Sequence, residues 1–337
     1  MKHLYIILAL CLLTSCNSEF KREIERTSIK TEIVTDSIYT RMPGTLLKTE
    51  KYVVWQDPFE TDGFVHVVDT EIKNEIGVIG KIGQGPKEFN TPAVEKGSHN
   101  SVLVSDLNSG KQALFSLDSV APQKNYYIEL PNSTNYAAIT RKIQLSDSSI
   151  ISLIPGATSH PFIIEKKGAL REFGSFPFEE TIKNGYNVYQ GNIAYNEDRN
   201  LLIYSLMNFF HIAIYERINE FDFILKNKNR PEVIYSLSES NLILDKNNKR
   251  GPGEMALTKD YIVTIQRDLS VDKTDESSVG MDFSKNATTV FLYDYRGELI
   301  RIVDLGLPLV RIAGDTQNNE LYAIGVDPEF VMVKCTL

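Results

Sequence analysis

Cysteine is scarce in this chain, which has three among its 337 residues. Small domains that depend on disulfides contain many more, so the chain is not a disulfide-stabilised mini-domain. Long hydrophobic runs are also missing, because no segment has the roughly 20 consecutive apolar residues that a membrane-spanning helix needs. Positive charge is in deficit, with 36 Lys and Arg against 44 Asp and Glu and a formal net charge of −8. That balance argues against a nucleic-acid partner, whose phosphates require a clustered positive surface.

Apolar residues, by contrast, are abundant enough for a large core. Hydrophobic residues make up 42% of the chain and charged residues 24%, which argues against global disorder. A chain of this length can bury one large core or two modest ones.

The first sixteen residues have the anatomy of an export signal. A basic start at residues 1–3 precedes an apolar run at 4–13 and the peptide Leu-Thr-Ser-Cys at 13–16. The run is too short to span a membrane and is typical of a cleaved secretory signal. The tetrapeptide resembles a bacterial lipobox, in which cleavage precedes the cysteine and its thiol receives diacylglycerol. We therefore predict a signal peptide at 1–15 and lipid attachment at Cys16. A soluble secreted protein and an uncleaved anchor are the alternatives.

Cleavage would change the cysteine and charge counts. Cys11 would leave with the signal and Cys16 would carry lipid, so only Cys335 would keep a thiol and no intramolecular disulfide could form. Loss of residues 1–15 removes one Lys, which leaves 35 Lys and Arg against 44 Asp and Glu, a net charge of −9. The polar segment 16–27 is interpreted as a lipidated tether and residues 28–337 as one folded domain.

A weak internal repeat predicts the fold. Short apolar runs of strand-forming residues start 50, 48, 51, 60 and 60 residues apart, at Tyr52, Val102, Ile150, Leu201, Tyr261 and Leu321. A second strand-like stretch follows each run, and a third follows the first five. Four antiparallel strands per unit, repeated radially, form the blades of a β-propeller. We expect an all-β, six-bladed β-propeller with four-stranded blades.

The last unit lacks an outer strand because the sequence stops at Leu337. Residues 29–34 precede the first unit and are predicted to complete the last blade, which would remove the exposed edge of an open array. Helices fit poorly, since apolar residues at helical spacing are not sustained over three turns whereas period-2 runs are common. A pair of β-sandwiches is the alternative fold, and six similarly ordered units argue against it.

Two connecting peptides resemble those of known propellers. Residues 83–89 (GQGPKEF) and 250–255 (RGPGEM) each follow an outer strand and precede the next inner strand. The first resembles the G-x-G-P-x-E-F connection of NHL-type and related six-bladed propellers. With the lipobox, residues 25–337 look similar to the TolB-like six-bladed propeller lipoproteins of Bacteroidetes. That resemblance implies the fold and an envelope location, and it transfers no catalytic residue.

The sequence shows no constellation typical of catalysis or metal binding. The four histidines beyond the signal, His66, His99, His160 and His211, lack His-x-x-x-His spacing and no Cys pair accompanies them, so a zinc site is not expected. No Gly-x-Ser-x-Gly motif occurs. We expect no cofactor besides the N-terminal lipid. Calcium is a weak alternative, because residues 267–286 are rich in acidic groups but do not match the EF-hand spacing.

The candidate interaction surface is the face that carries the loops after the six apolar runs. In a propeller these loops share a face with the crossovers between blades, near the central channel. The insertion at 267–286 is the longest of them and is interpreted either as a solvated loop or as a lid. Aromatic and polar groups around a concavity suit the binding of a ligand or a protein. The candidate residues are Asp57, Phe59, Asp106, Asn108, His160, Asn208, Phe209 and Asp268.

We expect a lipid-anchored, non-catalytic propeller of the cell envelope that binds a partner protein or a small ligand on this loop face. The alternative is an envelope hydrolase or lyase that uses acidic residues at the mouth of the channel, and a sensory or scaffold subunit is a third possibility. Two facing carboxylates in an open channel would favour the enzyme. We expect a monomeric outer-membrane lipoprotein on the periplasmic side rather than the cell surface, because residues 17–20 lack a dense acidic run.

Overall fold

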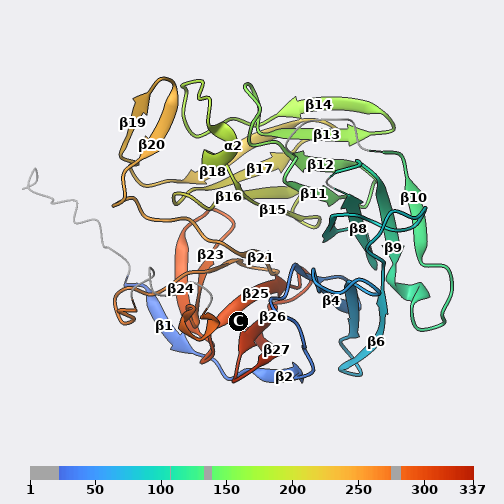
Figure 1. Ribbon diagram of the computed structural model, residues 1–337. Helices are drawn as coiled ribbons and strands as arrows, with labels where there is room; N and C mark the ends of the chain where they lie inside the picture. The colour runs from blue at the N-terminus through green and yellow to red at the C-terminus, as the bar shows by residue number, and fades with distance from the viewer. Residues whose placement is uncertain (1–22, 107, 133–138, 275–281) are drawn as a thin grey trace, which may run out of the picture.

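The computed structural model describes residues 23–106, 108–132, 139–274 and 282–337. The predicted signal peptide and Cys16 lie outside these ranges. Within them the regular structure is almost entirely β-sheet, and six sheets of four or more strands are arranged around a common centre (Figure 1). The expected all-β, six-bladed propeller is confirmed. No helix in the described ranges is long and apolar enough to cross a membrane.

Each blade is an antiparallel sheet whose strands follow one another from the centre outward. The first blade contains β3 Leu46–Lys48, β4 Tyr52–Gln56, β5 Val65–Asp69 and β6 Asn74–Ile79. The second contains β7 Pro92–Lys96, β8 Ser101–Asp106, β9 Gln112–Ser116 and β10 Tyr127–Leu130. The third contains β11 Arg141–Gln144, β12 Ile150–Leu153, β13 Phe162–Lys166 and β14 Ala169–Phe173.

The other three blades repeat this order. The fourth contains β15 Gly191–Asn196, β16 Leu201–Leu206, β17 Ile212–Arg217 and β18 Phe223–Asn229. The fifth contains β21 Met255–Leu257, β22 Ile262–Ile265, β23 Thr289–Tyr293 and β24 Leu299–Asp304. The sixth contains β25 Leu309–Gly314, β26 Glu320–Val326, β27 Phe330–Thr336 and the N-terminal strand β2 Glu32–Thr35.

The ring is closed by β2, as the sequence predicted. This strand pairs antiparallel with β27, with Ile33 opposite Val333. Val34 is buried in a cluster that combines Trp55 of the first blade with Tyr322 of the sixth. Closure therefore joins the two ends of the chain and covers the interface between the last and first blades.

A second N-terminal strand was not expected. β1 Glu25–Ser28 pairs parallel with β24, with Glu25 opposite Arg301, and adds a fifth strand to the fifth blade. Residues 25–27, assigned above to the tether, thus belong to the fold. The reason is that an outer strand leaves unpaired backbone groups at its edge, and β1 satisfies them.

The six recurring apolar runs are the second strand of each blade. The innermost strands precede them and range from three residues in β3 and β21 to six in β15 and β25. Their sequences mix charged and apolar residues, as in Arg-Lys-Ile-Gln of β11. Such strands border the channel, so they lack the continuous apolar character that reveals a strand buried on both faces.

Apolar clusters fill most interfaces between blades. Separate clusters join the first and second, third and fourth, fourth and fifth, fifth and sixth, and sixth and first blades. Between the second and third blades the described contacts are partly polar. The Lys142 ammonium donates to Gln112 Oε1 at 2.7 Å, and the Lys142 backbone N–H donates to Glu95 Oε1.

A few elements lie outside the blades. The hairpin of β19 Tyr235–Ser238 and β20 Asn241–Leu244 lies between the fourth and fifth blades in sequence and protrudes from the ring (Figure 1). The short helix α2 Gly185–Val188 lies in the crossover before the fourth blade. Asn184 joins the two, because its amide exchanges hydrogen bonds of 2.9 Å with the backbone of Leu242. The described residues also form the 3₁₀ turns η1 Leu117–Ser119 and η3 Phe283–Lys285.

Candidate functional site

Three aspartates of the predicted loop face are buried and hold their own loops together. Asp57 accepts hydrogen bonds from the Thr40 hydroxyl and the Phe59 backbone N–H, both at 2.9 Å. Asp106 accepts backbone N–H groups from both sides of its loop, including that of Asn90 at 2.5 Å. In each case the carboxylate replaces a backbone acceptor in a turn. These carboxylates therefore shape the face and are not offered to a ligand.

Asp268 is the third of these aspartates. It forms an ion pair with Arg26 of β1 at 2.7 Å and accepts the Ser270 hydroxyl at 2.6 Å. Burial alone would raise the pKa of Asp268, but these hydrogen bonds outweigh it and lower the pKa. The contact fixes the start of the 267–286 insertion against β1. The part of that insertion at 275–281 lies outside the described residues.

The two aromatic candidates differ. Phe209 is fully buried in the cluster between the third and fourth blades, with its ring 5.3 Å from that of Phe178. It therefore cannot contact a partner, and its inclusion in the surface was wrong. The loop between β16 and β17 is short, and it packs the Phe209 ring into the core between the blades. The apolar character of Phe209 alone does not distinguish a buried ring from an exposed one. Phe59 is 51% exposed, with the Arg41 guanidinium 5.8 Å from its ring.

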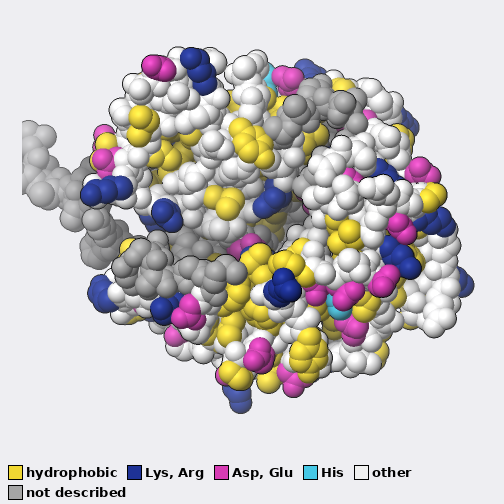
Figure 2. Space-filling view, in the orientation of Figure 1, with side chains coloured by type: hydrophobic (Ala, Val, Ile, Leu, Met, Phe, Trp, Pro, Cys, Tyr) yellow, Lys and Arg dark blue, Asp and Glu magenta, His cyan; other side chains and the backbone are white. Residues whose placement is uncertain are grey.

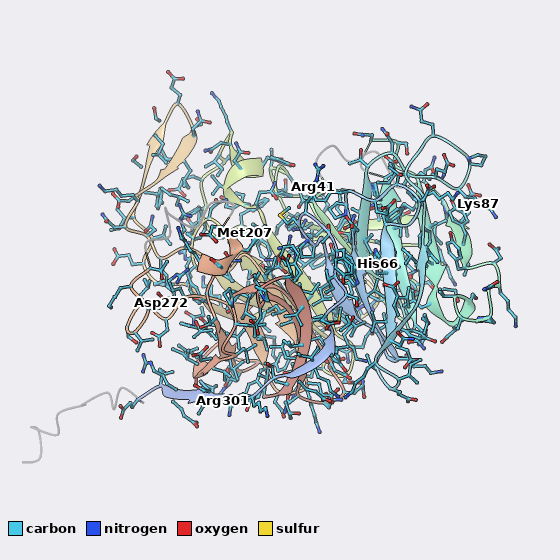
Figure 3. The ribbon with its side chains drawn as sticks, turned by 60° about the horizontal axis from the view of Figure 1, so that its bottom comes forward. Arg41, His66, Lys87, Met207, Asp272 and Arg301 are labelled. Atoms are coloured by element: carbon cyan, nitrogen blue, oxygen red, sulfur yellow. The ribbon has the colours of Figure 1, made fainter. Side chains whose placement is uncertain are left out.

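The polar candidates on the predicted loop face donate hydrogen bonds to residues of neighbouring loops and crossovers. His160 Nδ1 donates to the Gly174 carbonyl at 2.7 Å. Asn108 donates to the Thr91 hydroxyl at 2.7 Å, and Asn208 donates to the Asn187 carbonyl at 2.5 Å. In Figure 3, Met207 from one such loop and Lys87 from a crossover lie above Arg301 of β24. None of the eight candidates lines the cavity that the inner strands enclose.

The residues that do converge come from the inner strands. They enclose a cavity of about 530 Å³ at the centre of the ring, to which all six inner strands contribute. Figure 2 shows the hollow near the middle of the molecule, with Lys, Arg and acidic side chains beside it. Its volume falls in the range of small-molecule sites. The channel is therefore open rather than plugged by side chains.

Arginine and glutamate meet at the end of the channel near the crossovers. The Arg311 guanidinium pairs with Glu254 at 3.2 Å and donates to the Gly44 carbonyl at 2.6 Å. Arg141, the first residue of β11, donates only to its neighbour, the Thr140 carbonyl, among the described residues. Burial raises the pKa of Glu254, and the charges of Arg311 and Arg141 oppose that shift. We refer to Arg141, Glu254 and Arg311 as the arginine level.

Two lysines mark the opposite end. Lys48 and Lys96 are the last residues of β3 and β7. Lys48 is held by the Thr49 and Glu50 carbonyls and lies 3.6 Å from Asp315. Lys96 has no hydrogen bond or ion pair within the described part of the chain. Burial lowers the pKa of Lys96, and the charges of Glu197 and Asp315 partly offset that shift. We refer to Lys48 and Lys96 as the lysine level.

Glu95 directly precedes Lys96 in β7 and faces the third blade. Its Oε1 accepts the Lys142 backbone N–H, while its buried Oε2 has no partner among the described residues. Burial raises the pKa of Glu95 to about 7, against the hydrogen bond and charge of Lys142 and the charge of Arg141. Near neutral pH this carboxyl is therefore divided between its neutral and ionised forms.

The channel has a charge opposite to that of the whole chain. Its lining contains five Lys or Arg and two Glu, a formal charge of +3, in a chain of net charge −8. Low-dielectric walls around one sign of charge concentrate counter-ions. The cavity is thus suited to an anion.

The channel lacks the residue types of the common acyl-transfer sites. Among the described residues its lining contains no His, Cys, Ser or Asp, so it holds no Ser–His or Cys–His pair. Its two carboxylates do not face each other as a pair: Glu254 bonds to Arg311, and Glu95 bonds to the backbone of Lys142. No group of three His, Cys, Asp or Glu residues suited to a metal ion occurs in the described ranges.

The sequence contained a signal for these residues that went unused. Lys48, Lys96 and Arg141 lie four to nine residues before the starts of three recurring apolar runs, where an inner strand must lie. A cationic residue repeated in inner strands would have indicated a charged channel. The glutamates of the two Gly-Pro peptides differ in role. Glu88 accepts the Gly85 backbone N–H at 2.8 Å within its turn, whereas Glu254 lines the channel and pairs with Arg311.

Comparison with known proteins supports the fold. No family model and no curated protein matches the sequence. A solved member of the DUF4221 family from Bacteroides vulgatus aligns with a TM-score of 0.56 at 11% identity, over 94% of this chain and 98% of that one. A protein from Bacteroides fragilis described as exported gives 0.55 at 9%, over 93% and 99%. The chain is a six-bladed β-propeller.

A third propeller neighbour is a calcium-binding protein. Regucalcin from Agrobacterium tumefaciens aligns with a TM-score of 0.50 at 9% identity, over 92% of this chain and 94% of that one. At such identities the likeness shows the fold alone. The function of this propeller must therefore be argued from its own channel.

Proposed function

We propose that this propeller is an exported cell-envelope protein that binds a small organic anion in its central channel without transforming it. The observation that carries the proposal is the positive lining of an open channel, with Lys96 unpaired among the described residues. Lys96 is half-buried, so its ammonium loses part of its hydration without gaining a protein partner among the described residues, and an anionic ligand would offset that cost.

The envelope location rests on the N-terminal sequence. The lipobox-like peptide at 13–16 supports lipid attachment at Cys16 and membership of the TolB-like lipoproteins. One structural neighbour is described as exported, which is compatible with this location. We propose a monomer on the periplasmic side of the outer membrane, with 16–24 as the tether.

The loop face keeps a separate proposed role. Phe59, Asn108 and Asn208 are exposed there and are available to a partner protein. Their contribution to ligand binding is secondary in this proposal, because none of them lines the central cavity.

A thermal-shift screen tests the proposal. Purified protein without its signal is heated with succinate, suberate, citrate, galacturonate or inorganic phosphate. A ligand that binds only the native state raises the midpoint by mass action. We expect at least one organic anion to raise it, and Lys96→Met to abolish that rise. Lys246→Met is the matched control, since Lys246 is exposed and outside the channel. Absence of any shift in the wild type, or an equal shift in Lys96→Met, would contradict channel binding.

A further inference from the structure

Polar side chains surround the channel at the end near the crossovers. Each inner strand begins where a crossover ends, so residues at the starts of these strands lie at that end. Thr45, Gln190 and Glu254 directly precede β3, β15 and β21. With the rest of the arginine level and one residue of β15 they form what we call the polar ring, whose members all line the cavity: Thr45, Arg141, Gln190, Asn192, Glu254 and Arg311.

Hydrogen bonds between blades join several members of the polar ring. Arg311 of the sixth blade pairs with Glu254 at 3.2 Å and donates to the Gly44 carbonyl, just before the first blade, at 2.6 Å. Asn192 of the fourth blade donates to the carbonyl of Gly253, the neighbour of Glu254, at 3.0 Å. Residues of the first, fourth, fifth and sixth blades therefore meet at one depth of the channel.

Part of the hydrogen-bonding capacity of the polar ring is unused. Within the described ranges the side chains of Thr45 and Gln190 have no partner, and the Asn192 amide uses only its nitrogen. All three residues are half-buried. Hydroxyl and amide groups both donate and accept, so a ligand that displaces their water must offer donors and acceptors in return. A ligand with only apolar surface beside its acid group would leave them unpaired.

The cations with unused donors lie beside the polar ring on adjoining blades. Glu95 accepts the backbone N–H of Lys142, so the end of β7 lies beside the start of β11. Lys96 and Arg141 are the sequence neighbours of these two residues, and the lysine and arginine levels are therefore close together on this side of the channel. Among the described residues Arg141 donates only to the Thr140 carbonyl, and Lys96 donates to none. An acid group on this side of the channel faces both cations.

We infer that the channel binds a sugar acid, whose hydroxyl groups bond to the polar ring and whose single acid group faces Arg141 and Lys96. This inference rests on the proposed function and names the chemical class of its ligand. Charge-assisted hydrogen bonds hold the acid group, and the amides of Gln190 and Asn192 pair with hydroxyl groups. The Glu254 carboxylate accepts hydroxyl donors and repels a second acid group placed in the ring.

Isothermal titration with matched compounds tests the inference. Galacturonate carries hydroxyl groups and an acid group, galactose carries the hydroxyl groups alone, and cyclohexanecarboxylate carries the acid group on a ring without hydroxyl groups. Glucuronate and glucose form a second pair that differs in the orientation of one hydroxyl group. We expect at least one uronate to bind about tenfold more tightly than its parent sugar and than cyclohexanecarboxylate, as a few net hydrogen bonds or one charge-assisted bond would give.

Two variants separate the hydroxyl contacts from the acid contact. Gln190→Met keeps the length of the side chain and removes its donor and acceptor, so uronate affinity should fall about fivefold or more while that of cyclohexanecarboxylate stays the same. Arg141→Gln should weaken both acids and leave the parent sugars unaffected. Gln84→Met, on an exposed turn outside the channel, is the matched control and should change neither acid.

Three results would overturn the sugar acid and leave an anion-binding channel. The first is tighter binding of cyclohexanecarboxylate than of both uronates, or equal losses for both kinds of acid in Gln190→Met. The second is tighter binding of alanine, whose ammonium would pair with Glu254. The third is failure of both uronates to bind while another anion raises the thermal midpoint. If no acid binds and the thermal screen also finds no anion, the proposed function itself fails.

Discussion

Phe59 and Phe209 have the same side chain and lie in corresponding loops, but only one reaches the surface. Phe59 is 51% exposed and Phe209 is fully buried. Residue type and loop position therefore could not decide which aromatic group is available to a partner. Packing between the third and fourth blades decided it.

This difference predicts contrasting effects of truncation. Phe209→Ala should lower the free energy of unfolding by about 3–5 kcal/mol, the usual effect of emptying a buried phenylalanine site. Phe59→Ala should change it by about 0.5 kcal/mol or less. Urea unfolding of the two variants measures both values, and similar losses would contradict the assigned burial.

Glu95 predicts a pH dependence of stability. Its pKa is about 7 in the folded protein and about 4.3 when unfolded. Because the folded pKa is raised, ionisation of this carboxyl lowers stability as pH rises between these values. Glu95→Gln removes the ionisation and keeps an oxygen to accept the Lys142 N–H.

Relative to wild type, Glu95→Gln should gain about 1–3 kcal/mol between pH 4.5 and pH 8. Urea unfolding across this range measures the gain, with Glu71→Gln on an exposed turn as the control. A constant difference between Glu95→Gln and wild type would show that Glu95 does not ionise in this window.

At the scale of elements, strands buried on both faces could be predicted and strands beside the channel could not. Val53, Val102 and Leu202 belong to second strands packed between blades, and their apolar runs gave the repeat. The inner strands form the site, but their sequences mix charged residues with short apolar segments. Neither alternation of apolar residues nor a continuous apolar run therefore predicted these strands. The parallel addition of β1 was missed because the sequence Glu-Arg-Thr-Ser has no apolar pattern.

The closing strand β2 gives a test with a control in the same strand. Val34 is 6% exposed within the cluster between the sixth and first blades, whereas its neighbour Ile33 is 61% exposed. Val34→Ala should destabilise the protein by about 1–3 kcal/mol, from lost burial and a small cavity. Ile33→Ala should have little effect on the unfolding midpoint in urea. Equal effects would indicate that β2 does not close the ring in this register.

At the scale of the whole molecule, the repeat length of 50 to 60 residues predicted six blades and a single domain, and the structure confirms six blades. The net charge of the chain predicted less about the binding site than the repeat length predicted about the fold. The value of −8 argued against a nucleic-acid partner but did not reveal a channel of formal charge +3. A sum over the chain cannot show how charges are arranged, because residues from six inner strands meet only after the ring has closed.

Anomalous diffraction from crystals soaked in sodium bromide tests the positive channel most directly, since bromide reports anion sites without knowledge of the natural ligand. The account predicts a bromide peak inside the channel beside Lys96 in the wild type, and its loss in Lys96→Met. Bromide confined to the outer surface, with none in the channel, would contradict it.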